Sequence, residues 1–178
     1  SKAINYLYSS ADHKNAFDKY ISEYKFTHVF LQGQSNEPTL YTNDSCDFLE
    51  AIRYYYPKIK ENGAKIVLYQ TWKYSTYGYD MTEKLINGYN KAASISGGIV
   101  SRAGEAFRLY EETYGLTPSL YMDMNHQSEY GAYLSACVHY TTLTGKKASS
   151  NLYDYDKIPY AEQVKIRAIA DIIAYGNN

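Results

Sequence analysis

An aspartate and a histidine stand three residues apart in the stretch "YMDMNHQSEYG", between an apolar run and a segment with helical periodicity. A histidine can act as a general base near neutral pH, and a carboxylate bonded to it fixes its tautomer and stabilises the imidazolium. Asp123 and His126 are therefore a candidate catalytic dyad. The same spacing also occurs in polar loops that have no catalytic role. The surrounding elements are therefore needed to distinguish a catalytic dyad from a structural loop.

A second polar cluster, "LQGQSNEP", occupies residues 31–38. The side-chain amides of Gln32 and Gln34 could donate hydrogen bonds to a developing oxyanion. Ser35 could serve as a nucleophile if a histidine reached its hydroxyl. The structural alternative is a turn rich in Gly, Ser, Asn and Pro that closes a strand.

A third cluster, "YQTWKY", follows the next apolar run. Gln70 and Trp72, the only tryptophan, stand where a wall of a substrate site would lie, although a tryptophan at a strand end more often packs in a core. The other histidines, His13, His28 and His139, fall within predicted helices or strands and have no neighbours of metal-ligand type, so no metal site is predicted.

The elements that must position these clusters alternate between helices and strands. The apolar spacing predicts helices over 11–24, 45–63, 81–97, 128–145 and 160–176. It predicts strands over 26–32 and 64–72, and either a strand or an extended segment over 119–123. Residues 98–115 predict a short strand followed by a helix. Pro57 predicts a kink or break, Gly63 a helix end, and Thr82 a helix cap.

This alternation indicates an α/β fold with a mainly parallel sheet. In such folds ligands bind beyond the carboxyl ends of the strands. The three polar clusters each follow a predicted strand, so we expect all three at one edge of the sheet. This placement favours the catalytic interpretation of Asp123 and His126.

Composition narrows the class of protein. The 178 residues suit one domain over 1–178, and 18 basic against 19 acidic residues give a net charge of −1 with no block of like charge. Neither a nucleic acid nor a membrane is therefore an expected partner, and no apolar run is long enough to span a bilayer.

Two residue types in the composition carry further predictions. Cys46 and Cys137 are far apart in the sequence, so we expect buried thiols rather than a disulfide bridge. The 23 tyrosines predict either a core with hydroxyls at its edge or a ring-lined pocket suited to sugars, unless they only reflect a compositional preference.

Four segments together resemble a bacterial branch of the SGNH-type (GDSL-like) hydrolases, catalogued as a domain of unknown function. They are "HVFLQGQSNEP", "KIVLYQTWKYS", "GIVSRAGEAF" and "LYMDMNHQSEYGAYLSACVHYTTLTG", and the similarity covers roughly residues 26–175. The resemblance implies a three-layer α/β/α sandwich of flavodoxin-like type. It implies that Asp123 and His126 are the acid and base of a catalytic triad. It also implies that Gln32 or Gln34 lies near the oxyanion position, with Gln32 favoured because it ends a strand.

The chain departs from that family at the nucleophile. The family carries its serine in a Gly-x-Ser or Gly-Asn-Ser motif on the first strand, and no such motif precedes residue 26. The chain is thus expected to lack the first strand and to be the C-terminal part of a longer domain. In a second register, "GQSN" resembles the nucleophile block of related carbohydrate acetylesterases, with Ser35 as the nucleophile.

The leading hypothesis is a serine hydrolase domain of SGNH type that acts on an ester, with a carbohydrate acetyl ester as one candidate, and needs no cofactor. The alternative is a non-catalytic carbohydrate-binding or interaction module on the same fold. We expect an N-terminal partner fragment or self-association to cover the exposed sheet edge. The resemblance implies a secreted or cell-envelope location, although the first residues do not form a signal peptide.

Overall fold

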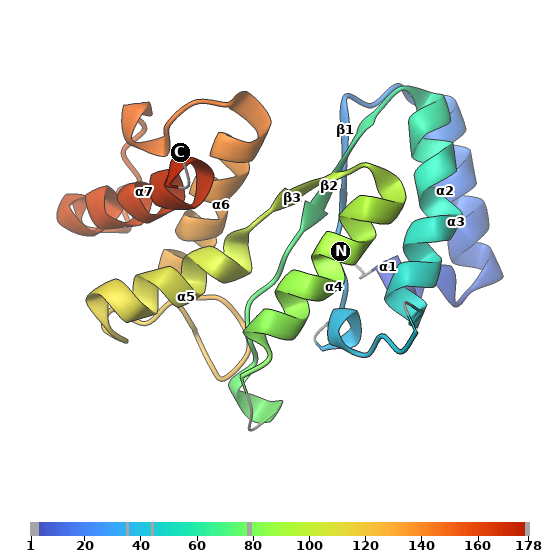
Figure 1. The fold of residues 1–178 in the computed structure, drawn as a ribbon. Coiled ribbons are helices and arrows are strands. Elements are labelled where there is room, and N and C mark those ends of the chain that lie inside the picture. Colours follow the sequence, from blue (N-terminus) through green and yellow to red (C-terminus); the bar gives the residue numbers. More distant parts are fainter. Residues whose placement is uncertain (1–3, 35, 44, 78–79, 177–178) are drawn as a thin grey trace. The chain divides into compact units, whose positions relative to one another are not determined.

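Figure 1 shows the computed structural model of the chain, which describes residues 4–34, 36–43, 45–77 and 80–176. The chain forms two compact units. The first contains the residues up to Thr71 together with Glu83–Val100, and the second contains Trp72–Thr82 and the residues from Ser101 onward.

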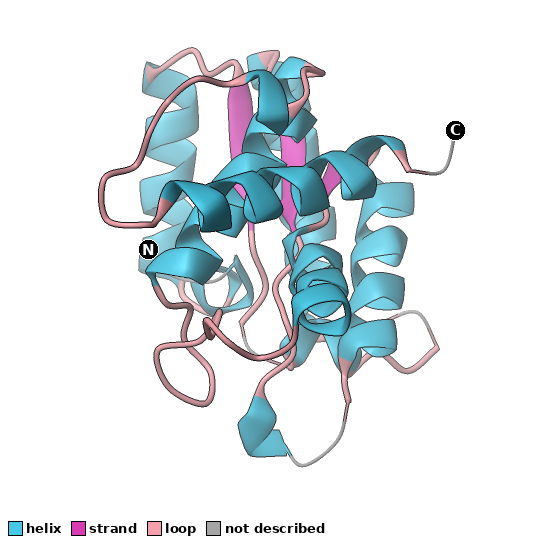
Figure 2. Ribbon diagram, turned by 90° about the vertical axis from the view of Figure 1, so that its left-hand side faces the viewer, coloured by secondary structure: helices cyan, strands magenta, loops and turns pink. Residues whose placement is uncertain are grey.

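The first unit is built around a small parallel sheet. Its elements, in chain order, are α1 (Ile4–Tyr8), α2 (Ala11–Glu23), β1 (His28–Leu31), the 3-10 helix η1 (Glu37–Thr39), α3 (Asp47–Asn62), β2 (Lys65–Tyr69), α4 (Thr82–Ser96) and β3 (Ile99–Ser101). The strand order is β1-β2-β3, and Val29 of β1 lies opposite Ile66 of β2. The strands lie side by side in Figure 2, with α3 and α4 as the helical connections between consecutive strands. The predicted α/β class with a parallel sheet flanked by helices is confirmed.

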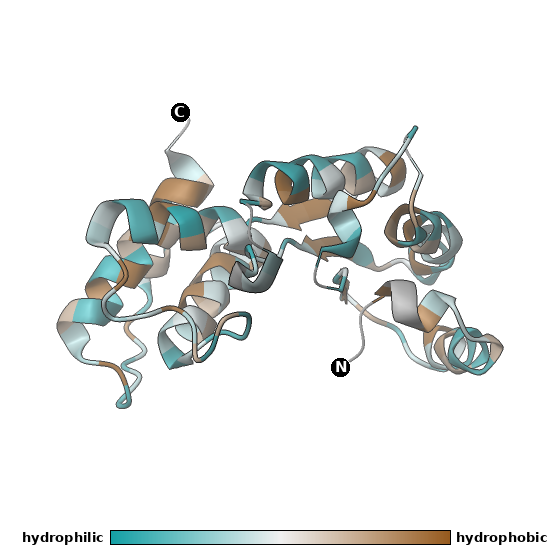
Figure 3. Ribbon diagram, turned by 90° about the horizontal axis from the view of Figure 1, so that it is seen from below, coloured by the Kyte–Doolittle hydropathy of each residue, from teal (hydrophilic) through white to brown (hydrophobic). Residues whose placement is uncertain are grey.

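The core of the first unit follows the apolar periodicity of the sequence. β2 buries three consecutive residues, Ile66, Val67 and Leu68, as expected for a strand covered on both faces, and the strands are hydrophobic in Figure 3. Helix α3 buries a face at helical spacing, made by Phe48, Leu49, Ala51, Ile52, Tyr55 and Ile59. It ends at Gly63, as predicted, in the left-handed conformation with φ of 87°.

Two local predictions about helices are corrected. Of the kink or break predicted at Pro57, the break does not occur, because helix α3 continues to Asn62. Proline removes one backbone hydrogen bond, and the buried side chains Tyr55 and Ile59 on either side hold the helix in place. Thr82 is the first residue of α4 rather than its cap, since the Asp80 carboxylate accepts hydrogen bonds from the Thr82 backbone and hydroxyl at 2.9 and 2.6 Å.

The second unit is helical in the residues that the structure describes. It contains the 3-10 helix η2 (Ser75–Tyr77), α5 (Ala103–Tyr114), α6 (Glu129–Thr144), the 3-10 helix η3 (Ala148–Ser150) and α7 (Tyr160–Tyr175). Helices α5, α6 and α7 pack against one another around fully buried side chains such as Phe107, Leu134 and Ile166.

Of the two alternatives predicted over 119–123, a strand or an extended segment, the strand is not formed. Tyr121 instead forms an isolated antiparallel bridge with Gln127, and the chain between them folds back as a loop. The backbone groups of this segment bond within the loop: the Met122 amide donates to the His126 carbonyl and the Ser128 amide to the Leu120 carbonyl, both at 2.8 Å. Apolar residues in a short run do not distinguish such a loop from a buried strand.

Candidate active site

Asp123 and His126 are hydrogen-bonded to each other, as predicted. Nδ1 of His126 lies 2.7 Å from Oδ2 of Asp123. The imidazole side chain is 70% exposed, and its Nε2 has no hydrogen-bond partner among the residues that the structure describes. One ring nitrogen is thus held by a carboxylate while the other faces outward, which is the arrangement that a general base requires.

The carboxylate of Asp123 is itself fixed by the loop. Its Oδ1 accepts hydrogen bonds from the backbone amides of His126 and Asn125, both at 2.7 Å. These amides, followed by the His126 side chain, lower the pKa of Asp123 to about 2. Asp123 therefore remains ionised throughout the pH range in which an imidazole changes its charge, and can stabilise an imidazolium.

The dyad loop, residues 119–128, is closed at its base by Ser128. The Ser128 hydroxyl donates to the carbonyl of Ser119 at 2.7 Å, and the same oxygen accepts from the amide of Gly131 at 3.3 Å as the N-cap of α6. The dyad loop is therefore continuous with the start of a well-capped helix, which limits its freedom.

Gly131 allows the dyad loop to lie directly on α6. A Cβ atom at this position would meet the carbonyl oxygen of Leu120 at 2.3 Å and the ring of Phe107 at 2.8 Å. Real Cβ atoms do not approach backbone that closely, so only glycine fits without displacement of the loop or the helix. This close approach is the physical reason for a glycine at this position of the "SEYGAY" segment.

Trp72 holds the dyad loop from the other side. Its indole Nε1 donates to the backbone carbonyl of Asn125 at 2.7 Å, and its ring stacks on Phe107 with centroids 4.6 Å apart. Trp72 is only 7% exposed, so its ring lies in the core rather than along an open wall. The structure thus brings Trp72, Asp123 and His126 together within the second unit.

The amide side chains predicted near an oxyanion belong to the first unit. Gln32 follows β1, and its carbonyl accepts from the amide of Ile4 at 2.8 Å. Gln34 is exposed in the following turn, whereas Gln70, after β2, is 1% exposed. Ser35 lies outside the described residues. The loop after β1 belongs to the first unit and His126 to the second. The expectation that both lie at one edge of the sheet therefore stays a prediction.

Asn125 is the site residue to which sequence reasoning gave no role. Its carbonyl accepts from Trp72, and its side-chain Oδ1 accepts from the hydroxyl of Thr76 at 2.8 Å. The available signal was its position between Asp123 and His126, where an Asn commonly supports a tight turn. The other histidines lie where predicted: His13 in α2, His28 in β1 and His139 in α6.

The described part of the chain shows neither a metal-binding cluster nor a membrane-spanning helix. No cluster of three or more His, Cys, Asp or Glu side chains with the geometry to hold a metal ion occurs there. Within the same residues, none of the helices has both the length and the apolar character needed to cross a bilayer. Cys46 and Cys137 are free thiols; Cys137 is buried, as predicted, whereas Cys46 is only partly buried.

Comparison with known proteins identifies the fold. Neither a family model nor a curated protein matches the sequence. Among solved structures, a DUF4886 family protein from Bacteroides uniformis is similar, with a TM-score of 0.72 and 18% identity over 91% of this chain and 68% of that chain. A candidate SGNH hydrolase from Slackia heliotrinireducens has a TM-score of 0.66 and 21% identity over 80% of each chain. The chain therefore has an SGNH-hydrolase-like fold.

Proposed function

We propose that this chain is a serine hydrolase domain of SGNH type that cleaves esters, with Asp123 and His126 as the acid and base of its triad. The observation that carries the proposal is the 2.7 Å contact between His126 Nδ1 and a carboxylate that two backbone amides already hold. The fold supports the proposal by analogy, because a solved structure with a similar fold is described as a candidate SGNH hydrolase.

In the proposed reaction, Nε2 of His126 takes the proton of a serine hydroxyl as the serine oxygen attacks the acyl carbon. The alcohol then leaves with that proton, and an acyl-serine remains. Water, deprotonated by the same imidazole, releases the acid and restores the serine. Asp123 keeps its charge throughout and stabilises the imidazolium in both halves of the reaction.

Ser35 is the proposed nucleophile within this chain, in the Gly-Gln-Ser-Asn register. A serine in a segment preceding residue 1 is the other source, which the sequence pattern of related hydrolases favours. Gln32 and Gln34 are the proposed oxyanion donors. An ester of a carbohydrate is the proposed substrate.

Labelling with a fluorophosphonate probe tests the nucleophile directly, because the probe reacts with a serine that a neighbouring base activates. The labelled residue is mapped by peptide mass spectrometry in the parent chain and in Ser35→Ala, His126→Ala and His139→Gln variants. Label on Ser35 that disappears in His126→Ala, but survives in His139→Gln, supports the proposal. Label on Ser35 that does not depend on His126 contradicts the proposed dyad.

The alternative function is a non-catalytic binding module on the same fold. It is favoured by a tyrosine-lined cavity in the second unit, whose lining includes neither Asp123 nor His126. If the parent chain takes no label and hydrolyses no p-nitrophenyl acetate, both alone and when expressed with its preceding segment, the binding module replaces the hydrolase.

A further inference from the structure

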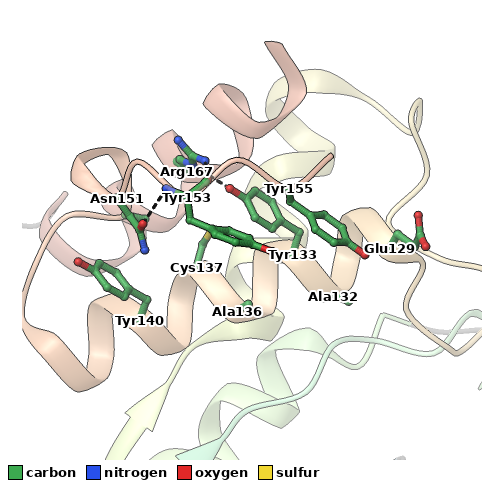
Figure 4. A pocket seen from close by; sticks show the side chains of 11 residues that line it. Glu129, Ala132, Tyr133, Ala136, Cys137, Tyr140, Asn151, Tyr153, Tyr155 and Arg167 are labelled. Atoms are coloured by element: carbon green, nitrogen blue, oxygen red, sulfur yellow. Dashed lines mark hydrogen bonds between the residues drawn. The ribbon is translucent and has the colours of Figure 1, made fainter. Parts of the chain in front are cut away.

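A cavity of about 480 Å³ lies in the second unit, between α6 and the loop that leads to α7. Figure 4 shows side chains of α6 forming one side and side chains of the loop forming the other. It is lined by Glu129, Ala132, Tyr133, Ala136, Cys137, Tyr140, Ala148, Asn151, Tyr153, Tyr155 and Arg167. Its volume falls in the range of sites for small molecules.

The walls of this cavity suit a flat apolar body. Four of its lining residues are tyrosines and three are alanines, and the rings of Tyr133 and Tyr155 are stacked with an interplanar angle of 12°. Small alanine side chains on α6 leave space, while the rings provide faces for stacking.

The position of the 151–158 loop is fixed by Gln163, which is fully buried on α7. Its Nε2 donates to Asp154 at 2.7 Å, to the carbonyl of Tyr155 at 2.9 Å and to the carbonyl of Ile158 at 2.7 Å. The two N–H groups of this amide are shared among the three acceptors. They hold the loop and its tyrosines in a set arrangement, so the cavity is preformed.

A buried positive charge lines the cavity. Arg167 is 6% exposed, and its Nε donates to the hydroxyl of Tyr133 at 2.8 Å, a bond visible in Figure 4. Its Nη2 donates to the Tyr153 carbonyl and to Oε1 of Gln163. All of these acceptors are neutral, and within the described residues no carboxylate forms an ion pair with Arg167.

Glu129, the acidic residue of the cavity lining, does not pair with the guanidinium of Arg167. Glu129 is exposed and pairs with Lys157 at 3.4 Å. Nη1 of Arg167 has no hydrogen-bond partner in the described part of the chain. A buried guanidinium without an anionic partner is costly, and a ligand carboxylate in the cavity would supply that partner.

From this combination we propose that the cavity binds a small carboxylate with a flat aromatic body, its rings against the tyrosines and its carboxylate paired with Arg167. This site uses neither Asp123 nor His126, and the inference is independent of the proposed hydrolase activity.

The probe for the test is 2-naphthoate, and 2-naphthamide is its neutral counterpart of almost the same shape. Calorimetric titration of the parent chain should show one saturable site for 2-naphthoate, with a dissociation constant about tenfold or more below that of 2-naphthamide, as a charge-assisted bond provides. Equal affinity for the two probes, or no saturable binding of 2-naphthoate, would overturn the proposal.

Two variants locate the site without touching the buried network. Ala136→Leu places a larger side chain in the cavity and should abolish binding of 2-naphthoate. Ala174→Leu makes the same change at an exposed position of α7 that does not line the cavity, and should bind as the parent does. Melting curves followed by circular dichroism check that both variants fold. Unchanged binding in a folded Ala136→Leu variant contradicts the proposed site.

Discussion

Two histidines of the second unit make hydrogen bonds of the same length with opposite consequences. Nδ1 of His126 lies 2.7 Å from a carboxylate oxygen of Asp123, and Nδ1 of His139 lies 2.7 Å from the hydroxyl of Ser101. The first ring is exposed on a loop, whereas the second is partly buried within α6 and its serine is fully buried.

The difference shows that a serine beside a histidine is not sufficient for catalysis. Burial lowers the pKa of His139 to about 4, so its imidazole is neutral at pH 7 and its charged form is disfavoured. Ser101 is 0% exposed and offers no surface to a substrate. His126 instead has a carboxylate partner on one ring nitrogen and an exposed second nitrogen. Partner and exposure, rather than bond length, separate the candidate base from the structural residue.

The largest expected difference between substitutions of the two histidines is in the rate of ester hydrolysis. His126→Ala should reduce ester hydrolysis by at least about 10³-fold, because removal of a triad base leaves only the contribution of binding and oxyanion stabilisation. Asp123→Asn should have an effect of similar order, since an amide can leave the imidazole in the wrong tautomer. His139→Gln should retain the parent kcat/KM. Equal losses in the His126 and His139 variants would show that partner and exposure do not separate the two histidines.

The second effect is on the pH dependence of stability. The pKa of His139 in the folded chain, about 4, lies below its ordinary value of 6.5, so the unfolded chain binds this proton first as the pH falls. The free energy of unfolding should therefore decrease between pH 6.5 and pH 4, by up to about 3 kcal/mol from this residue.

Urea unfolding at a series of pH values measures this slope in the parent, in His139→Gln and in Ser101→Ala. His139→Gln should flatten the slope, whereas Ser101→Ala keeps the buried imidazole and should retain it. A parental slope in His139→Gln would show that another group causes the loss of stability.

A third, smaller effect concerns the support of the dyad loop. Gly131→Ala should lower the free energy of unfolding by about 2 kcal/mol, because the added Cβ would meet the Leu120 carbonyl at 2.3 Å and force the loop or α6 to move. It should also reduce ester hydrolysis, since the loop carries Asp123 and His126. An alanine variant with the parental melting temperature and activity would contradict the close approach.

The smallest expected effect is at the cap of α6. Ser128→Ala should lower the free energy of unfolding by about 1 kcal/mol, because it removes the hydroxyl that accepts from Gly131 and donates to Ser119. Ser128→Thr retains the hydroxyl and is the matched control. Similar urea midpoints for Ser128→Ala and the parent would mean that the cap adds little to the stability of the loop.

Much of the fold was predictable from local patterns. The helix predicted over 45–63 is found at Asp47–Asn62, and that over 128–145 at Glu129–Thr144. In both helices glycine at the C-terminal end adopts the left-handed conformation that other residues avoid. The strand over 64–72 is confirmed but shorter, at Lys65–Tyr69. The short helix α1 was missed, because five residues carry too little periodicity.

For the candidate site, the sequence predicted the pair of Asp123 and His126. The prediction was possible because the contact spans three residues and the loop's own amides hold the carboxylate. The sequence could not show that residues 119–123 are a loop rather than a strand, since a short apolar run fits both. Only the tertiary structure decided that Trp72 supports the loop and that Arg167 is buried without an anionic partner. The physical reason is distance along the chain: the bond from Trp72 to Asn125 joins residues 53 positions apart, and contacts of that kind depend on packing that no local pattern encodes.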